Sequence, residues 1–358
     1  NRQYKWKYCA DDRCDYCVLN MNKKGVLLVN LGTPDSPSTA DVRKYLNEFL
    51  MDERVIDINL IARALLVKGL IVPFRAPKSA KLYQAIWSDQ TGSPLKHYSI
   101  IQADLLQKRL GEDYHVELAM RYQSPSIDSA LKKLKDAQVS SIKILPLFPQ
   151  YASASTGSVL EKVMNLVSKW QTIPSLSFIN SFHDNELMIE TFVENALKHQ
   201  PDTYDHILFS FHGLPESQLK SGDHSQKHCL KTKNCCSTLT ADNQFCYAAQ
   251  CHHTARLIAE KMGLDEGKYT VCFQSRLGTD PWVKPYTSKV IKDLASKGVK
   301  RLLILCPAFV ADCLETVYEV SVEYGDEFKA LGGEHVQLVE SLNDHPKWIA
   351  ALEELVKN

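Results

Sequence analysis

The chain alternates short, continuous apolar runs with segments whose apolar residues recur every three or four positions. Segments of the second kind, such as 126–137, 254–263 and 288–298, predict amphipathic helices. Continuous apolar runs are typical of strands that are covered on both faces. Such runs cover residues 25–31, 115–122, 142–151, 206–211, 269–275, 301–309 and 336–342. The alternation predicts an α/β fold built from parallel sheets.

Strand–helix cycles occur in both halves of the chain, which predicts two doubly wound lobes with a cleft between them. We expect an N-terminal lobe in residues 21–185 and a C-terminal lobe in residues 186–358. Residues 218–250 break the rhythm, because they are polar, rich in cysteine and without helical periodicity. They predict an insertion between a strand and a helix that begins near His252.

Composition and charge narrow the class of protein. The 358 residues are 44% hydrophobic and 23% charged, which suits a globular protein with two lobes. Lys+Arg and Asp+Glu both number 42, so the chain lacks the basic excess typical of nucleic-acid binding. The apolar stretch 60–74 is interrupted by Arg63 and Lys68 and is shorter than the roughly 20 residues of a membrane span. We therefore expect a cytoplasmic protein with no nucleic-acid partner.

The first 20 residues differ from the rest of the chain. They are polar and have no apolar centre of the kind found in secretory signals. Met21 then opens a stretch that reads as a natural start. We expect residues 1–20 to be an extension or tail outside the fold. Their cysteines, Cys9, Cys14 and Cys17, form only part of a ferredoxin-like spacing.

Unusual residues collect where the predicted strands end. The run 206–211 is followed by His212 and Gly213, and the run 301–309 is followed by Asp312. In open parallel α/β sheets, ligands bind outside the carboxyl ends of the strands. We expect these ends to share one edge, so that His212 and Asp312 face a common mouth. A histidine in this position, taken alone, would more often be an ordinary loop residue.

Three carboxylates follow at helical spacing. Glu315, Glu319 and Glu323 are four residues apart, which places them along one face of a helix. Like charges at that spacing cost about a few tenths of a kcal/mol per pair. A solvated acidic face is one interpretation. The other is a column of oxygen ligands that delivers a divalent cation to a neutral imidazole. The position of His212 on a converging strand end favours the second interpretation.

Seven motifs carry a resemblance to a known family. They occur in order between Gly25 and Leu355: LLVNLGTPDSP, GSPL, AMRY, FPQYASASTGS, FSFHGLPES, FQSRLGTDPW and ADCLETVYE. Together they resemble ferrochelatase, and in particular bacterial members with an internal cysteine-rich insertion. The resemblance implies two Rossmann-like lobes around a porphyrin cleft. It also implies a lyase that inserts Fe(II) into protoporphyrin IX, the last step of haem biosynthesis.

The resemblance also implies roles for individual residues. His212 and Glu315 would be the catalytic pair and would bind the substrate iron, with Asp312, Glu319 and Glu323 forming an acidic path beside them. The porphyrin and its propionates would contact Arg75, Tyr83, Ser93, Arg121, Tyr151 and Trp282. The chain departs from some relatives at Cys313, where they carry histidine. The sequence leaves open whether His212 accepts protons or ligates iron.

Other functions remain compatible with the same residues. A sister chelatase would act on another tetrapyrrole, either coproporphyrin III or a cobalt-accepting precursor. A non-catalytic carrier would hold porphyrin or metal without turnover. The pairing of His212 with Glu315 favours an enzyme, because binding alone does not require a proton acceptor beside a metal column.

The insertion contains five cysteines within 23 residues. Four thiolates suit a 2Fe–2S cluster or a structural zinc ion, and a set of reduced thiols is the third interpretation. The resemblance to ferrochelatases with an internal cluster favours 2Fe–2S. The expected ligands are Cys229, Cys235, Cys236 and Cys246, with Cys251 as a substitute. Cys272 and Cys306 lie inside apolar strands and are predicted to be core residues.

The apolar stretch 60–74 has two interpretations, a core helix or an exposed surface. The resemblance implies the second, an active-site lip over residues 60–78. Such a lip would collect a hydrophobic porphyrin and allow peripheral contact with a membrane. The sequence does not determine the oligomeric state.

Overall fold

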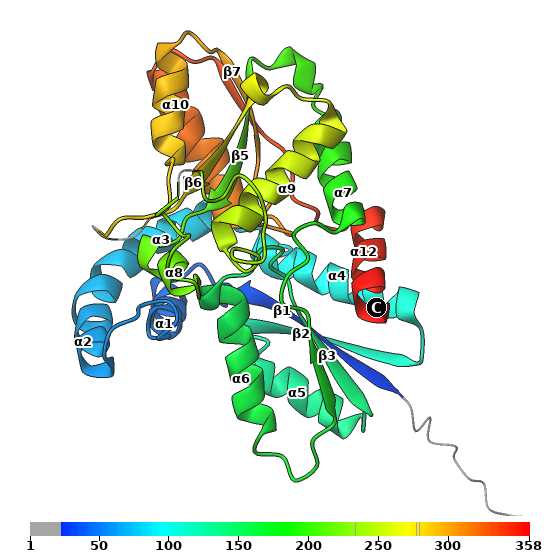
Figure 1. Cartoon of the computed structure of the whole chain (residues 1–358). Coiled ribbons are helices and arrows are strands. Elements are labelled where there is room, and N and C mark those ends of the chain that lie inside the picture. Colours follow the sequence, from blue (N-terminus) through cyan, green and yellow to red (C-terminus); the bar gives the residue numbers. More distant parts are fainter. Residues whose placement is uncertain (1–22, 233, 277, 279) are drawn as a thin grey trace, which may run out of the picture.

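The computed structural model describes residues 23–358 except 233, 277 and 279. The expected tail 1–20, with its three cysteines, lies outside the described residues. Two parallel four-stranded sheets, each flanked by helices, form two lobes that lie one above the other in Figure 1. The predicted fold class, two doubly wound α/β lobes, is confirmed.

The sheet of the first lobe has the strand order β2-β1-β3-β4. Its strands are β1 (Lys24–Gly32), β2 (Tyr114–Tyr122), β3 (Ser141–Pro146) and β4 (Ser175–Phe178). Alternate residues of β1 enter two different hydrophobic clusters: Leu27 and Val29 pack on one face, Val26 and Leu28 on the other. The first face is covered by α5 (Ile127–Asp136) and α6 (Ser158–Val167), the second by α4 (Pro94–Leu110). Burial of both faces explains the continuous apolar run.

The sheet of the second lobe has the order β6-β5-β7-β8. Its strands are β5 (His206–His212), β6 (Tyr269–Gln274), β7 (Arg301–Leu305) and β8 (His335–Leu338). One face packs against α7 (Glu186–Leu197) and α9 (Tyr247–Met262). The other packs against α10 (Thr287–Ser296) and α11 (Gly325–Ala330). Cys272 and Cys306 are buried here, as predicted for core residues.

The sequence had led us to expect that all the strand ends share one edge. This expectation is wrong, because the strands belong to two separate sheets. β1 ends in one sheet, whereas β5, β6 and β7 end together in the other. Two predicted strands are also shorter than their apolar runs, because β3 stops at Pro146 and β7 stops before Pro307. The edge strand β4 escaped prediction because it has only four residues and carries serines.

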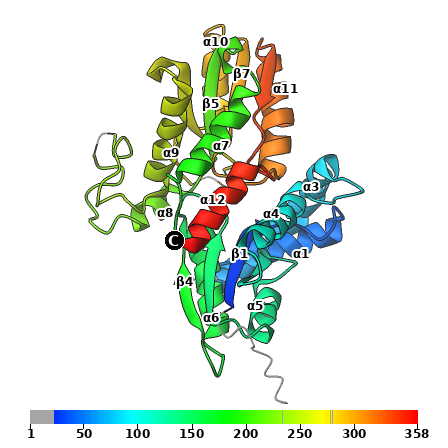
Figure 2. The same ribbon diagram turned by 90° about the vertical axis from the view of Figure 1, so that its right-hand side faces the viewer.

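The lobes are joined by a shared core and by the C-terminal helix α12 (Pro346–Lys357), which packs on both α4 and α7. Figure 2 shows α12 crossing between the lobes. Trp348 of α12 is fully buried in the cluster that also contains Phe209 of β5 and Leu28 of β1. Gln102 of α4 donates to the carbonyl oxygens of Val310 (2.9 Å) and Asn343 (2.8 Å).

A helical arm extends from the first lobe (Figure 1). It contains α1 (Thr39–Leu50), α2 (Leu60–Ala64), a π-helix at Leu65–Ile71 and α3 (Val72–Ile86). Large apolar side chains on this arm face solvent, with exposed fractions of 74% for Ile61, 71% for Leu65 and 69% for Phe74. The exposed interpretation of residues 60–74 is therefore confirmed over the core-helix one. No helix within the described residues is long and apolar enough to cross a membrane.

The remaining helical segments are short. They are a π-helix at Ser153–Gly157, 3₁₀ turns at Pro201–Thr203 and Glu266–Lys268, α8 (Glu216–Ser221) and a π-helix at Leu314–Tyr324. π-helices are rare and often occur at functional sites. The π-helix at Leu314–Tyr324 carries the predicted acidic column.

Candidate active site

His212 is the last residue of β5, an inner strand of the second sheet, and it therefore lies at the carboxyl edge of that sheet. Its Nδ1 lies 2.7 Å from the Gly213 carbonyl oxygen. Because a carbonyl oxygen only accepts, Nδ1 carries the proton and Nε2 of the neutral ring presents a lone pair. The Trp282 ring lies beside the imidazole, with centroids 6.5 Å apart, and Tyr247 donates to the His212 carbonyl oxygen at 2.8 Å. The ring is therefore oriented with Nε2 able to accept a proton or bind a cation.

Gly213 is required by close packing behind His212. Its N–H donates to the Gln274 carbonyl oxygen at 2.7 Å. A Cβ at this position would lie 2.9 Å from that same oxygen and 3.2 Å from the Trp282 ring. Backbone cannot yield as a flexible side chain does, so any larger residue displaces the loop that carries His212.

We expect Gly213→Ala to lower turnover by about 100-fold, since a displacement of roughly 1 Å at a reacting group can cost that much. The matched control is Gly222→Ala, where the added Cβ would meet only an ordinary contact at 3.4 Å. The measurement is steady-state turnover together with a thermal unfolding curve. Wild-type turnover in a folded Gly213→Ala protein would show that the His212 loop needs no such precision.

The acidic column lies on the π-helix Leu314–Tyr324, which is not the α-helix that the spacing had predicted. The helix begins where the Cys313 N–H donates to Thr316 Oγ1 at 3.0 Å. Its start is anchored by Asp312, which accepts from Asn343 Nδ2 at 2.7 Å and from the Ser341 N–H at 3.2 Å. These hydrogen bonds tie Asp312 to the segment before α12.

Glu319 is the most firmly held carboxylate of the column. It accepts from the Ser275 N–H (3.0 Å), the Ser275 hydroxyl, Gln274 Nε2 (3.3 Å) and Tyr324 (2.8 Å). Ser275 follows β6 with a positive φ of 59°, a strained conformation for a residue with a side chain. This conformation lets both its donors reach Glu319, so the strain serves to fix that carboxylate.

Glu315 lies at the other end of the column. Its carbonyl oxygen accepts from Gln274 Nε2 at 2.9 Å, which ties the first turn of the π-helix to the end of β6. Burial, followed by the charge of Glu315 and a hydrogen bond to it, raises the pKa of the Cys313 thiol well above its usual value. The thiol therefore stays protonated and donates to Glu315. Burial, then the charges of Glu319 and Glu327, raises the pKa of Glu323.

The predicted porphyrin-contact residues come from both lobes. Tyr83 and Arg75 lie on α3, which packs against the π-helix that carries Glu315. Tyr83 is buried with its ring edge against Tyr45, whereas Arg75 is exposed. Ser93 is buried at the start of α4 and accepts from Thr33 Oγ1 at 3.0 Å. Trp282 lies beside His212, as described above. The contacts of these residues with porphyrin stay predictions.

Arg121 belongs to a buried network that the sequence did not reveal. Its Nη2 lies 2.5 Å from Asp52 Oδ2, and its Nε donates to Ser158 Oγ at 2.6 Å. Asp52 also accepts from Tyr122 (2.9 Å), from Ser158 (2.5 Å) and from the Arg54 N–H (2.8 Å). Burial alone would raise the pKa of Asp52, but these hydrogen bonds and the Arg121 charge hold it below its usual value. In the sequence, Asp52 is a single aspartate after α1, and no spacing to its partners marks it as part of a network.

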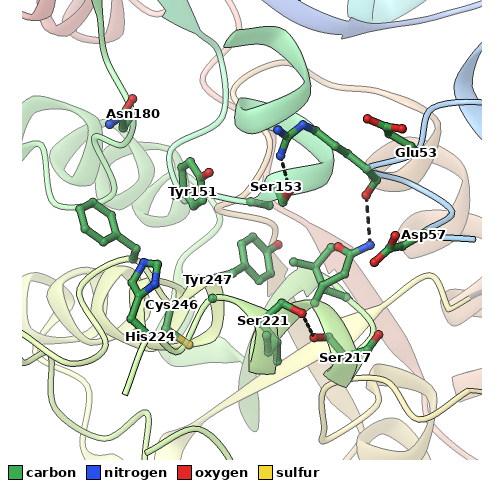
Figure 3. A pocket seen from close by; sticks show the side chains of 17 residues that line it. Glu53, Asp57, Tyr151, Ser153, Asn180, Ser217, Ser221, His224, Cys246 and Tyr247 are labelled. Carbon is green, nitrogen blue, oxygen red and sulfur yellow. Dashed lines mark hydrogen bonds between the residues drawn. The ribbon is translucent and has the colours of Figure 1, made fainter. Parts of the chain in front are cut away.

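A cavity of about 620 Å³ is bordered by the segment that follows His212, through Leu214, Ser217 and Gln218 (Figure 3). Tyr151 and Ser153 line one side, and Tyr247 and Cys246 line another. Leu214 also lines it, two residues after His212, but neither His212 nor Glu315 does. Of the predicted porphyrin contacts, only Tyr151 borders this cavity. The cavity therefore lies between the first lobe and the cysteine insertion.

Hydrogen bonds between its own residues hold the insertion in its conformation. Asp223 accepts hydrogen bonds from the Ser225 hydroxyl and from the N–H groups of Ser225, His228 and Cys229. The bond from the Ser225 hydroxyl, followed by those from the N–H groups, lowers the pKa of Asp223. Asn243 donates to the carbonyl oxygens of Cys235 (2.9 Å) and Thr238 (2.8 Å). Helix α9 begins at Tyr247, not near His252 as expected, and α8 occupies the start of the predicted insertion.

Four of the cysteines gather at the N-terminus of α9. The sulfurs of Cys235 and Cys236 are 3.7 Å apart. A hydrogen bond from Cys236, and two from N–H groups at the helix start, lower the pKa of Cys246 to about 6 despite burial. Burial, then the proximity of Cys246 and Cys235, raises the pKa of Cys229 to about 11. Cys251 is fully buried one turn into α9, beside Tyr247.

Fold and site together define a two-lobed α/β protein with an imidazole and an acidic helix at the carboxyl edge of one sheet. The structure of SirB from Bacillus subtilis with Fe3+ shares this fold, with a TM-score of 0.51 and 13% identity over 94% of each chain. The sequence model of the family described as Ferrochelatase matches residues 23–358.

Proteins named ferrochelatase are similar to this chain over most of its length, and two of them serve as examples. The protein of Coxiella burnetii (strain CbuK_Q154) is 46% identical over 341 residues, which cover 95% of both chains. That of Legionella pneumophila (strain Lens) is 44% identical over 335 residues, covering 93% of this chain and 98% of the relative. The chain therefore belongs to the ferrochelatase family.

Proposed function

We propose that this protein inserts Fe(II) into protoporphyrin IX and releases protohaem, as a lyase of haem biosynthesis. The observation that carries the proposal is the oriented imidazole of His212, whose Nε2 lone pair is set by the bond from Nδ1 to Gly213. Membership of the chain in the ferrochelatase family supports the same proposal. Protoporphyrin IX and ferrous iron are the proposed substrates.

Insertion exchanges two pyrrole protons for one divalent cation. We assign His212 to accept a proton from the porphyrin or to ligate the entering iron, and Glu315 to balance the cation's charge beside it. Glu319, Glu323 and Asp312 form the acidic path toward that pair. A shaped pocket holds the ring distorted with binding energy from the rest of the macrocycle.

The proposal includes the lobe boundary, the porphyrin contacts and the membrane surface. We propose that the two lobes divide between residues 185 and 186, and that the porphyrin contacts Arg75, Tyr83, Ser93, Arg121, Tyr151 and Trp282. The exposed apolar side chains of residues 60–78 form a lip at the mouth of the cleft. That lip supports peripheral contact between a cytoplasmic enzyme and a membrane surface, from which a hydrophobic porphyrin would be collected.

The test of the substrate is a comparison of porphyrins. Purified protein is mixed anaerobically with ferrous iron and either protoporphyrin IX or coproporphyrin III, and the loss of porphyrin fluorescence is followed. The proposal predicts a higher kcat/KM for protoporphyrin IX. A preference for coproporphyrin III would assign the protein to the sister activity, and binding without catalytic turnover of either would make it a carrier.

We further propose that the insertion binds a 2Fe–2S cluster through Cys229, Cys235, Cys236 and Cys246. The four thiols lie close enough to influence one another's pKa, as the ligands of one cluster would. The lowered pKa of Cys246 at the start of α9 also favours the thiolate form that binds iron. A cluster would stabilise the fold of the insertion, in which Cys246 borders the cavity. Iron insertion involves no electron transfer, so the cluster supplies structure or regulation.

Cys229→Ser is expected to abolish the cluster, whereas Cys251→Ser retains it, because Cys251 is enclosed by α9 beside Tyr247. Iron and acid-labile sulfide content and the visible absorption of the anaerobically purified proteins provide the measurement. Loss in Cys251→Ser and retention in Cys246→Ser would reverse the ligand assignment. Zinc in place of iron and sulfide would replace the cluster with a structural zinc site.

A further inference from the structure

Three metal-binding side chains meet outside the site described above. The ligand atoms of His183, Asp184 and His253 all lie within 4.8 Å of one another. His183 and Asp184 lie between β4 and α7, in the segment that leads into the second lobe, and His253 lies on α9. His183 Nε2 and His253 Nδ1 are only 3.2 Å apart. Two ring nitrogens bound to one ion at about 2.0–2.1 Å would be separated by roughly 3.0–3.4 Å.

The orientation of the His183 ring is fixed by hydrogen bonding on its other side. His183 Nδ1 lies 2.9 Å from Ser181 Oγ. That hydroxyl has two acceptors besides the ring, the Pro149 carbonyl oxygen at 2.8 Å and Gln250 Oε1 at 3.2 Å. Its single proton goes to one of these oxygens, so Oγ accepts from His183 Nδ1–H. The Nε2 atom of His183 consequently directs a lone pair at His253.

This is the arrangement found around metal-binding histidines, in which the non-ligating N–H is held by a second partner. Without a metal, His253 Nδ1–H donates to His183 Nε2. Binding of a cation would require the other neutral tautomer of His253, in which the proton sits on Nε2 and Nδ1 presents a second lone pair to the ion. His183 is only 6% exposed, whereas Asp184 is exposed and leaves the group open to solvent.

We propose that His183, Asp184 and His253 form a second metal site, which binds a borderline divalent transition metal, Zn2+ or Fe2+, separately from the iron substrate. Two imidazoles and one carboxylate suit such ions, whereas hard cations prefer a larger set of oxygen ligands. The inference rests on this geometry and does not depend on the proposed function.

The site would fasten α9 to the segment that joins the lobes. Thr254, next to His253, already donates to the His183 carbonyl oxygen at 2.7 Å and accepts from Gln150 Nε2 at 3.0 Å. The same helix begins at the cysteine insertion. A bound metal therefore stabilises the junction between the lobes, and its loss lowers the unfolding temperature of the whole protein.

The test is a titration of the purified full-length protein with Co2+, followed by absorption, and with Zn2+ and Fe2+, followed by metal content after gel filtration. Wild type is expected to bind one equivalent more than His183→Gln, His253→Gln or the exposed Asp184→Asn. That equivalent should show cobalt d–d bands without sulfur-to-cobalt charge transfer, which separates it from the cysteines. The Zn2+ and Fe2+ arms decide which ion binds more tightly, and Mg2+ should not compete.

Two further variants keep the test specific. His252→Gln changes the neighbouring histidine on α9, whose ring contacts Phe273, and should bind metal as wild type does. Ser181→Ala should weaken binding by about 10–100-fold, as expected when a partner of a metal-binding histidine is removed. Equal stoichiometry and affinity in wild type and in all three ligand variants would overturn the proposal.

Discussion

His212→Ala and Glu315→Gln are each expected to reduce iron-insertion turnover by about 10²–10⁴-fold, the range typical of a lost general acid–base group. His212 is the last residue of β5, and the contact of its Nδ1 with the Gly213 carbonyl oxygen leaves an Nε2 lone pair that can accept a proton. Glu315→Gln keeps the shape of the side chain but removes the charge that would balance the entering cation. The measurement is the initial rate of porphyrin fluorescence loss under anaerobic conditions.

Matched controls separate chemistry from folding. His206→Gln changes the histidine at the other end of β5, which bonds to Thr270 at 2.9 Å. Glu327→Gln changes a carboxylate just after the π-helix that pairs with Lys292 at 3.2 Å. Both should turn over within a few-fold of wild type. If His212→Ala or Glu315→Gln matched these controls, the two residues would not be the catalytic pair.

Asp52→Ala is expected to lower the free energy of unfolding by about 3–5 kcal/mol, the cost of leaving one partner of a buried ion pair uncompensated. The side chains of Asp52 and Arg121 are only 6% and 14% exposed. Removing the carboxylate also leaves the Tyr122 and Ser158 hydroxyls without their acceptor. Urea unfolding at neutral pH provides the measurement, and the exposed Asp57→Ala, expected to change stability by less than about 0.5 kcal/mol, is the control.

The same carboxylate predicts a pH dependence. The folded pKa of Asp52 lies below the unfolded value of about 3.9. Its contribution is therefore fully present above the unfolded pKa and is lost as the pH falls through the folded pKa. The stability difference between wild type and Asp52→Ala should shrink as unfolding is measured at successively lower pH below about 4. A difference that stayed constant over that range would show that Asp52 titrates alike in both states.

Much of the fold is encoded in local pattern. The apolar run of β1 predicts a strand covered on both faces, and Val26, Leu27, Leu28 and Val29 are all fully buried. His212 could be singled out because a buried strand ends on it before Gly213 and Pro215. The residues of β4 gave no such signal, because the strand is short and half exposed at the sheet edge.

The remaining features depend on contacts between distant segments. Asp52 is joined to Arg121 and Ser158 across 69 and 106 residues, and no spacing in the sequence reports that encounter. His183 and His253 meet across 70 residues for the same reason. The π-helical winding of the acidic column could not be read from its four-residue spacing, which is equally typical of an α-helix. Its start is fixed by Asn343 and Ser341, far along the chain.

The measurement that tests the central claim most directly compares binding with turnover in one variant. Protoporphyrin IX affinity and anaerobic iron-insertion rate are measured for wild type and Glu315→Gln. The account predicts that wild type turns over repeatedly and that Glu315→Gln binds porphyrin within a few-fold of wild type while its insertion rate falls by at least about 100-fold. Porphyrin binding without turnover in wild type, or undiminished insertion in Glu315→Gln, would contradict the assignment of iron insertion to His212 and Glu315.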